Sequence, residues 1–454
     1  MNPELFREYD IRGIADTDLA DDSVETLGRG LGTYFVRHGA ARVTLGRDVR
    51  LSSTRLRDAL ARGLTRTGLT VIDIGVCPTP LLYYSLHRLK PEAGVMITGS
   101  HNPPEYNGFK VALGTGTIYG AEIQKVRKII EAADFASGGG ELESASLMED
   151  YRRHIGERIP PLGKRLKVVV DSGNGTAGLV APAVYSDLGC EVHELYSEPD
   201  GRFPNHHPDP TLVENLEDLI QAVRSSEADL GISFDGDTDR IGVVDDAGGI
   251  LWGDQLMMIY AREILERRPG TTFVAEVKCS KSLYQDIEAR GGRAVMWKAG
   301  HSLIKAKMKE EGAVLGGEMS GHMFFADRYF GYDDAIYAGA RLLEILADSG
   351  RRLSQLLEDV PPTFSTPEIR MDCPEDLKFR IVSLAQSYFS NNYETVDVDG
   401  VRIVFPDGWG LVRASNTQPV LVLRFEADSP ERLEEIQSLV RGKLEELSGG
   451  IHAS

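Results

Sequence analysis

Short apolar runs alternate with longer stretches of helical spacing over most of the chain. The runs are rich in β-branched residues and lie at 42–46, 69–75, 167–171 and 272–278. Stretches with helical spacing follow them, for example at 52–68 and 282–291. Apolar β-branched runs that alternate with helices are typical of α/β units built on a mainly parallel sheet. The pattern occurs in three successive parts of the chain and therefore predicts three mixed-sheet α/β domains.

The pattern changes after Pro361 and Pro362. Residues 363–371 alternate between apolar and polar side chains, and a helix start follows at the Pro-Glu-Asp sequence. Three further strand-like runs and a final amphipathic helix lie at 400–405, 410–414, 419–427 and 429–447. These signals predict a smaller C-terminal α+β domain. The glycine-rich segment 134–143 is expected to be a loop, and the predicted domains are 1–150, 151–250, 251–362 and 363–454.

Charge and composition narrow the possible partners. The chain of 454 residues has 50 basic and 69 acidic side chains and a formal charge of −19. No basic stripe is present, which argues against nucleic acid as a partner. The apolar stretches are much shorter than the roughly 20 residues of a membrane span, and the first residues do not form a secretory signal. The four cysteines have no C-x-x-C spacing, so we expect reduced, mostly buried thiols and a cytoplasmic protein without a membrane partner.

The first motif with chemistry is Thr98-Gly-Ser100-His101-Asn102-Pro103-Pro104. It follows the strand-like run 94–97, and glycine and proline keep such a loop from becoming a helix. Ser100 could therefore be a nucleophile or a phosphoryl carrier, with His101 or Lys110 as a neighbouring activating group. Taken alone, the motif is explained at least as well by an ordinary proline-rich turn.

The second motif places Asp235, Asp237 and Asp239 directly after the apolar run 230–233. Alternate residues of an extended chain point to one side, so three carboxylates could converge on one hard cation such as Mg²⁺. A solvated acidic turn is the plainer alternative. A phosphatase of the haloacid dehalogenase type also uses alternating aspartates, but its motif requires Thr or Val where Asp239 stands.

Two further polar loops are weak signals individually. In the first, Glu318 and Ser320 lie on a glycine-rich loop and could bind adjacent sugar hydroxyls, although a plain polar turn fits as well. The second lies between two strands of the last predicted domain and consists of Arg413, Ser415, Asn416 and Thr417. A guanidinium with clustered hydroxyl and amide donors suits a phosphate group, and a capped hairpin turn is equally compatible.

Together, the four motifs occur in a fixed order with one in each predicted domain. That arrangement resembles the α-D-phosphohexomutase family over essentially the whole chain, and most of all its phosphomannomutase/phosphoglucomutase branch. The resemblance implies four domains around a central cleft. It also implies reversible transfer of a phosphoryl group between positions 1 and 6 of mannose or glucose phosphate. The reaction would pass through a phosphoserine enzyme and a hexose 1,6-bisphosphate.

The resemblance also implies roles for individual residues. Ser100 would carry the phosphoryl group, and Asp235, Asp237 and Asp239 would hold Mg²⁺ together with an oxygen of that phosphate. The other expected catalytic residues are Arg12, His101, Lys110, Arg240 and His301, of which Lys110 and His301 are the candidate general acid/base groups. The expected substrate-binding residues are Tyr9, Lys278, Glu318, Ser320, His322, Arg413, Ser415, Asn416 and Thr417. Without the resemblance, we would interpret Lys278 as a surface cation, His301 as a loop histidine and Arg12 as the partner of a nearby acid.

Several alternatives stay open at this point. A phosphoglucosamine mutase of the same family would share these motifs, and a Mg²⁺-dependent sugar-phosphate phosphatase or a non-catalytic sugar-phosphate-binding protein would share some of them. The expected partners are small hexose phosphates, the expected cofactors are Mg²⁺ and hexose 1,6-bisphosphate as activator, and the expected assembly is a monomer or weak dimer.

Overall fold

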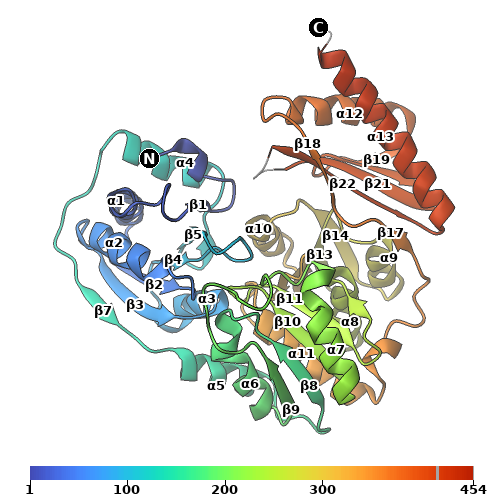
Figure 1. Ribbon diagram of the computed structural model, residues 1–454, viewed down its shortest axis with the longest axis horizontal. Helices are drawn as coiled ribbons and strands as arrows, with labels where there is room; N and C mark the ends of the chain where they lie inside the picture. The colour runs from blue at the N-terminus through green and yellow to red at the C-terminus, as the bar shows by residue number, and fades with distance from the viewer. Residues whose placement is uncertain (416–418, 453–454) are drawn as a thin grey trace.

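Four β-sheets follow one another along the chain in the computed structural model, which describes residues 1–415 and 419–452. Figure 1 shows them as an arc, with the first and the fourth at its two ends. The described residues also include four short 3-10 helices, one before the first strand and three between later elements, at Pro3–Leu5, Thr176–Leu179, Val213–Leu216 and Leu353–Gln355. Within the described residues, no helix is both long enough and apolar enough to cross a membrane.

The first sheet has seven strands in the order β1-β5-β4-β2-β3-β7, with β6 paired to β5. Its central pairs are parallel, whereas β5 runs antiparallel to β1 and β4. The strands are β1 Ile11–Ile14, β2 Arg42–Arg47, β3 Thr70–Val76, β4 Ala93–Ile97, β5 Tyr106–Leu113, β6 Gly116–Thr117 and β7 Leu142–Ser144. The helices are α1 Asp21–Arg37, α2 Ser53–Thr65, α3 Thr79–Arg88 and α4 Ala121–Glu131. The segment expected to be a loop, 134–143, is one as far as residue 141, and edge strand β7 begins beside β3 at residue 142.

The second and third sheets are also mixed, with strand orders β12-β11-β10-β8-β9 and β14-β13-β15-β16. The second contains β8 Lys167–Asp171, β9 Glu191–Leu195, β10 Leu230–Phe234, β11 Ile241–Asp245 and β12 Ile250–Leu251, with helices α5 Met148–Arg158, α6 Ala181–Asp187 and α7 Glu217–Ser226. The third contains β13 Thr272–Glu276, β14 Arg293–Trp297, β15 Leu315–Gly317 and β16 Met323–Phe325, with helices α8 Gly253–Arg267, α9 Lys281–Ala289, α10 His301–Glu311 and α11 Ala335–Ser349.

The fourth sheet is antiparallel throughout, in the order β17-β22-β21-β20-β19 with β18 on β22. Its elements are β17 Phe364–Ser365, β18 Ile369–Asp372, α12 Lys378–Asn392, β19 Glu394–Val396, β20 Val401–Phe405, β21 Gly408–Ala414, β22 Val420–Ala427 and α13 Pro430–His452. The predicted fold class, three mixed-sheet α/β domains and a smaller α+β domain, is confirmed.

Apolar packing joins the first three sheets more tightly than the fourth. One buried cluster extends from Ile72 of β3 through Ile232 of β10 to Leu342 of α11. The fourth sheet has a separate cluster of its own, and a small group of Val277, Trp409 and Leu411 links it to the third. All four cysteines are buried and free, as expected from their spacing.

Candidate active site

Three loops that follow strands of different sheets meet at one place. Ser100 follows β4 of the first sheet, Asp235 follows β10 of the second, and Glu318 follows β15 of the third. Ser100 Oγ donates a hydrogen bond of 2.7 Å to Asp235 Oδ2, which joins the first two loops directly. Parallel strands present their carboxyl ends at the same sheet edge, and loops at such edges commonly form ligand sites in α/β folds.

Ser100 is held in a conformation that few serines adopt. Its φ is +48°, in the left-handed region, and the residue is only 3% exposed. Its amide donates to Thr98 Oγ1 at 2.8 Å, and its Oγ lies 3.2 Å from His101 Nδ1. Burial and the positive charges of Arg240 and Arg12 hold the pKa of His101 well below 6.5, so its ring is neutral at neutral pH and can accept a proton. The structure therefore brings the predicted nucleophile and His101 together.

The three aspartates converge as predicted, although for a different reason. One carboxylate oxygen from each aspartate lies within 4.8 Å of the oxygens offered by the other two. The loop is a turn with Thr238 at φ +67°, whereas the sequence argument assumed an extended chain. Asp235 Oδ1 accepts the amides of Asp239 and Arg240, at 3.1 Å each, and these bonds close the turn.

This carboxylate set fits a hard divalent cation. Asp237 Oδ1 and Asp239 Oδ1 are buried and have no hydrogen-bond partner among the described residues. Burial and the charge of Asp237 raise the pKa values of Asp235 and Asp239, which shows that negative charge is crowded here. Oxygen ligands on a tight turn are the ligands that Mg²⁺ prefers.

Lys110 of β5 lies inside the same cluster. Its Nζ donates to Asp237 Oδ2 at 2.6 Å and to Asp239 Oδ2 at 2.5 Å. Burial alone would lower the pKa of the Lys110 ammonium, but the charges of Asp237 and Asp239 outweigh it, and the pKa is raised. Lys110 is therefore a charged group at this site, which suits electrostatic stabilisation better than proton abstraction.

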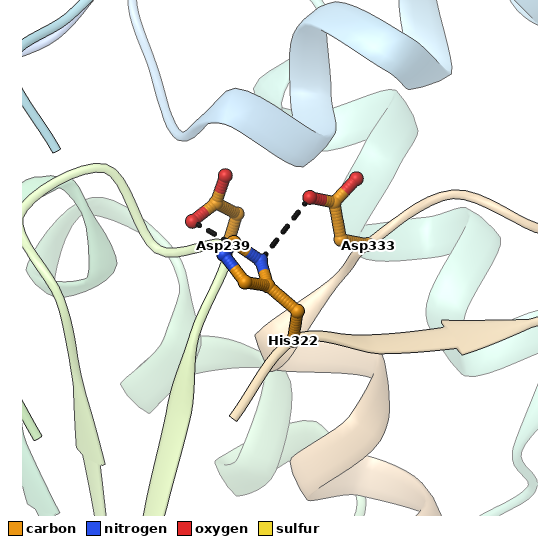
Figure 2. Close-up of side chains that lie close together, drawn as sticks. All are labelled: Asp239, His322 and Asp333. Carbon is orange, nitrogen blue, oxygen red and sulfur yellow. Dashed lines mark ion pairs between the residues drawn. The ribbon is translucent and has the colours of Figure 1, made fainter. Parts of the chain in front are cut away.

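A second group of polar side chains surrounds Asp333 (Figure 2). Asp333 Oδ2 lies 3.2 Å from His322 Nδ1, and Asp239 Oδ1 lies 3.6 Å from the same nitrogen. Arg240 Nε donates to His322 Nε2 at 3.1 Å. Because an arginine nitrogen can only donate, Nε2 is the acceptor in the neutral ring and the proton lies on Nδ1, facing Asp333. His322 and Arg240 thus lie beside the aspartates and Ser100.

His301 stacks on His322, with ring centroids 5.6 Å apart, and faces the same oxygen of Asp333. Its Nδ1 is 3.8 Å from Asp333 Oδ2, and Lys305 Nζ donates to Asp333 Oδ1 at 2.9 Å. Burial and the charge of Lys305 hold the pKa of His301 well below 6.5. The ring is consequently neutral at neutral pH, and a proton taken up by it would be stabilised by Asp333.

Arg12 and Tyr9 approach from the N-terminal segment. Arg12 Nη1 donates to Asn102 Oδ1 at 2.9 Å, next to the Ser100 loop, and Arg12 also pairs with Asp10. Tyr9 OH donates to the carbonyl oxygen of Ala299 at 2.9 Å, two residues before His301. Arg12 therefore lies beside the Ser100 loop, and Tyr9 contacts the segment that leads into α10.

The expected sugar loop is folded back on itself. Glu318 Oε1 accepts the amide of Gly300 at 2.7 Å, and its Oε2 accepts the hydroxyl of Ser320 at 3.2 Å. Lys278 Nζ pairs with Glu368 Oε2 at 3.1 Å and lies 3.5 Å from Glu276 Oε2. Glu318 and Lys278 follow β15 and β13, which are paired in parallel, so both lie at the same edge of the third sheet.

The expected phosphate loop is described in part. Arg413 is 7% exposed and donates from Nε to Asp399 Oδ2 at 2.9 Å. Ser415 is buried, and its carbonyl oxygen accepts Lys378 Nζ at 2.6 Å. Asn416 and Thr417 lie outside the described residues. The roles assigned to all these side chains stay predictions.

Several residues of the site were not found from the sequence. Thr79 donates its hydroxyl to Asp237 Oδ2 and its amide to the carbonyl oxygen of Asp237. Asp333 and Lys305 complete the environment of the two histidines. None of them belongs to a recognisable motif, and the one available signal was the Pro-Thr-Pro sequence at 78–80, which is typical of a helix start. Glu276 lies two residues before the predicted Lys278 but was not itself predicted.

Replacing Lys110 by Met should strengthen metal binding. The ammonium competes with a cation for Asp237 and Asp239, so its removal should raise the affinity for Mg²⁺ in calorimetric titration. Without metal the two buried carboxylates lose their partner, and stability should fall by about 3 kcal/mol. Lys125→Met, which removes an exposed pair with Glu122, is the control and should change neither quantity. Unchanged or weaker Mg²⁺ binding by Lys110→Met would contradict this picture of the site.

Glu276 should make stability depend on pH. Burial raises its pKa to about 7, against the opposing charge of Lys278. The native state therefore holds the Glu276 proton more tightly than the unfolded chain, so this stabilisation is fully present below the ordinary pKa of 4.5 and is lost as the pH rises from there through about 7. Glu276→Gln stays neutral, so its Tm relative to that of the wild type should be lowest at about pH 4 and should rise until about pH 8, where the Tm of the variant is the higher. A Tm difference that is independent of pH would show that the raised pKa is wrong.

Most of the chain matches a single family, domain by domain. Residues 3–137, 149–249 and 252–364 match the phosphoglucomutase/phosphomannomutase alpha/beta/alpha domains I, II and III, and residues 368–443 match the C-terminal domain of that family. The matches occur in the order of the four sheets.

Individual relatives agree with this assignment. Phosphomannomutase/phosphoglucomutase of Pseudomonas aeruginosa is 48% identical over 450 residues, 98% of this chain and 96% of that protein. Phosphoglucomutase of Neisseria gonorrhoeae is 44% identical over 447 residues, 97% of each. The crystal structure of a phosphoglucomutase/phosphomannomutase family protein from Burkholderia thailandensis has a TM-score of 0.93 at 42% identity, over 99% of both chains. The resemblance predicted from the motifs is confirmed, and the chain belongs to the phosphoglucomutase/phosphomannomutase family.

Proposed function

We propose that this protein is a phosphohexomutase that interconverts the 1-phosphate and 6-phosphate of mannose, glucose or both. The observation that carries the proposal is the 2.7 Å hydrogen bond from Ser100 Oγ to Asp235 Oδ2. A phosphoryl carrier next to a cation-binding triad is the arrangement that phosphoryl transfer needs, since the reaction depends on positioning and on charge stabilisation. The names of the relatives, phosphomannomutase/phosphoglucomutase and phosphoglucomutase, support the same activity.

In this proposal, Ser100 carries the phosphoryl group and gives it to the free hydroxyl of a bound hexose phosphate. Asp235, Asp237 and Asp239 would hold Mg²⁺, which when bound neutralises charge on the transferred group. Arg12 and Arg240 lie next to Ser100 or Asp235 and supply positive charge to the same group.

One side chain must also take the proton of the attacking sugar hydroxyl. Of the two predicted acid/base residues, His301 fits this role because its lowered pKa leaves it neutral, with Asp333 beside it. Lys110 is already protonated and paired with two carboxylates, so its role is to stabilise charge.

The sugar bisphosphate formed in this way must turn around in the site before its other phosphate returns to Ser100. Recognition should therefore rest on groups that accept both orientations. Glu318 and Ser320 would bind sugar hydroxyls, and Arg413 with Ser415 would bind the phosphate that is not being transferred. Asn416 and Thr417 stay part of this proposal, as do Tyr9, Lys278 and His322 on the substrate side.

The remaining predictions also belong to this proposal. Hexose 1,6-bisphosphate would activate the enzyme by phosphorylating Ser100, and the domain boundaries would fall near residues 150, 250 and 362. Four free, buried cysteines are consistent with work in the reducing cytoplasm. We also retain small sugar phosphates as the partners and a monomer or weak dimer as the assembly.

Ser100→Ala should abolish the isomerisation of glucose 1-phosphate and mannose 1-phosphate, because the variant has no oxygen to carry the phosphoryl group. A coupled assay for the 6-phosphates measures the loss, and release of inorganic phosphate is measured in parallel. Ser186→Ala, on the exposed side of α6, is the control and should be fully active.

The same assay distinguishes the other functions. Inorganic phosphate as the main product would identify a phosphatase, and binding without turnover in the wild type would identify a sugar-phosphate-binding protein. A kcat/KM highest for glucosamine 1-phosphate would identify a phosphoglucosamine mutase. Normal turnover by Ser100→Ala would contradict the assignment of Ser100 as the phosphoryl carrier.

A further inference from the structure

Beneath the Ser100 loop lies an arginine that none of the motifs includes. Arg50 stands between β2 and α2, and its side chain is 0% exposed. A fully buried guanidinium is costly unless each of its donors finds an acceptor. The acceptors that Arg50 uses are therefore informative.

Arg50 donates to four backbone carbonyl groups of one short segment. Its Nη2 bonds the carbonyl oxygens of Ser100, at 2.8 Å, and Asn102, at 2.5 Å. Its Nη1 bonds the carbonyl oxygens of Tyr106, at 3.0 Å, and Pro103. The planar fork of a guanidinium can reach four acceptors in this way, whereas the three donors of a lysine all leave from a single nitrogen.

Asp48 holds the start of the same loop. Its Oδ2 lies 3.2 Å from Arg50 Nε and accepts the amide of Gly99 at 3.1 Å. Its Oδ1 accepts the hydroxyl of Ser53 at 2.6 Å and the amide of Arg50 at 3.0 Å. The pair Asp48 and Arg50 therefore binds the loop on its amide side at residue 99 and on its carbonyl side from residue 100 to residue 106.

The contact leaves no space between loop and guanidinium. A Cβ added at Gly99 would lie 2.4 Å from Cζ of Arg50. On the other side of the loop, a Cβ added at Gly236 would lie 2.6 Å from the carbonyl oxygen of Ser100. The peptide group of Ser100 is thus packed between Arg50 and the aspartate loop of the second sheet.

This packing explains how Ser100 keeps its unusual backbone. A left-handed conformation costs a non-glycine residue about 1 kcal/mol or more and persists only where neighbouring groups impose it. Few backbone hydrogen bonds inside the loop could do so: within 98–106 they are Asn102 to Gly99 and Tyr106 to Pro103. Arg50 supplies the four additional bonds.

We infer that Arg50 is a positioning residue for phosphoryl transfer: by bonding four carbonyl groups of the loop, it fixes the Oγ of Ser100 against Asp235. The inference rests on the proposed function, in which Ser100 carries the phosphoryl group. The side chain of Arg50 contacts carbonyl groups of the loop and Asp48, and among the described residues it makes no hydrogen bond to the three aspartates or to the predicted sugar-binding residues. Its effect should therefore appear in kcat, with little change in KM, because Glu318 and Ser320, which would bind the sugar hydroxyls, lie on a loop of the third sheet.

Arg50→Lys tests this. The variant keeps the charge and the pairing with Asp48 but cannot reach four carbonyl groups, so kcat should fall by about 100-fold, the usual cost of a displacement near 1 Å at a reacting group. The KM for glucose 1-phosphate should stay close to that of the wild type. Amides of residues 98–106 should exchange hydrogen faster than in the wild type.

Arg341→Lys is the matched control. Arg341 is also 0% exposed and paired with carboxylates, but it lies on α11 and contacts Asp327 and Glu263. It should lose stability and keep its kcat. The inference would be overturned if Arg50→Lys and Arg341→Lys had the same Tm and lost kcat equally. It would also be overturned if Arg50→Lys kept the kcat of the wild type, or if only its KM rose.

A second variant covers the case in which Arg50→Lys does not fold. Gly99→Ala keeps the arginine but displaces its guanidinium, and it should also lower kcat and speed amide exchange over residues 98–106. Wild-type kcat in Gly99→Ala would count against the inference. If the wild type itself shows no isomerisation, the proposed function fails, and the exchange measurement still decides whether Arg50 holds the loop.

Discussion

Burial of negative charge is the constraint on which the site depends. Asp235, Asp237 and Asp239 are all 0% exposed, and three carboxylates out of water are tolerated only with cations or donors in contact. Much of that compensation comes from another sheet: Lys110 and Thr79 both belong to the first. The aspartates are therefore stable only when the first two sheets are correctly assembled, and the same contact that assembles them brings Ser100 to Asp235. The contact between the first two sheets therefore serves both folding and the placement of Ser100.

The strands and the four motifs could be predicted because they depend on local sequence. A short apolar run bounded by turn residues favours a strand, and Ser100, Asp235 and Glu318 lie on loops that directly follow such runs. The convergence of the aspartates was also predicted, but from an extended chain. The turn that produces it is closed by amides bonding Asp235, and no residue spacing reveals such a bond.

The features of the site that could not be predicted depend on contacts between residues that are distant in sequence. Thr79 bonds Asp237, which lies 158 positions further along the chain. Arg50 bonds the backbone carbonyl groups of the Ser100 loop rather than its side chains. The role of Asp333 becomes apparent only from its contacts with His301, His322 and Lys305. Lys110 was identified as an active-site residue, yet its pairing with two carboxylates changes the chemistry expected of it. Side-chain identity indicates what a residue can do, whereas its neighbours decide which of those options it uses.

The distribution of the apolar core has a consequence for cooperativity. A cluster that runs from β3 through β10 to α11 cannot be lost from one of the first three sheets without exposing the others. The fourth sheet, with its own cluster and a link of three side chains, does not share that dependence. Separating the fourth sheet would therefore expose little of the buried apolar core beyond the small group of Val277, Trp409 and Leu411. Separating any one of the first three sheets would expose the large shared cluster, although the first sheet also has a second cluster of its own.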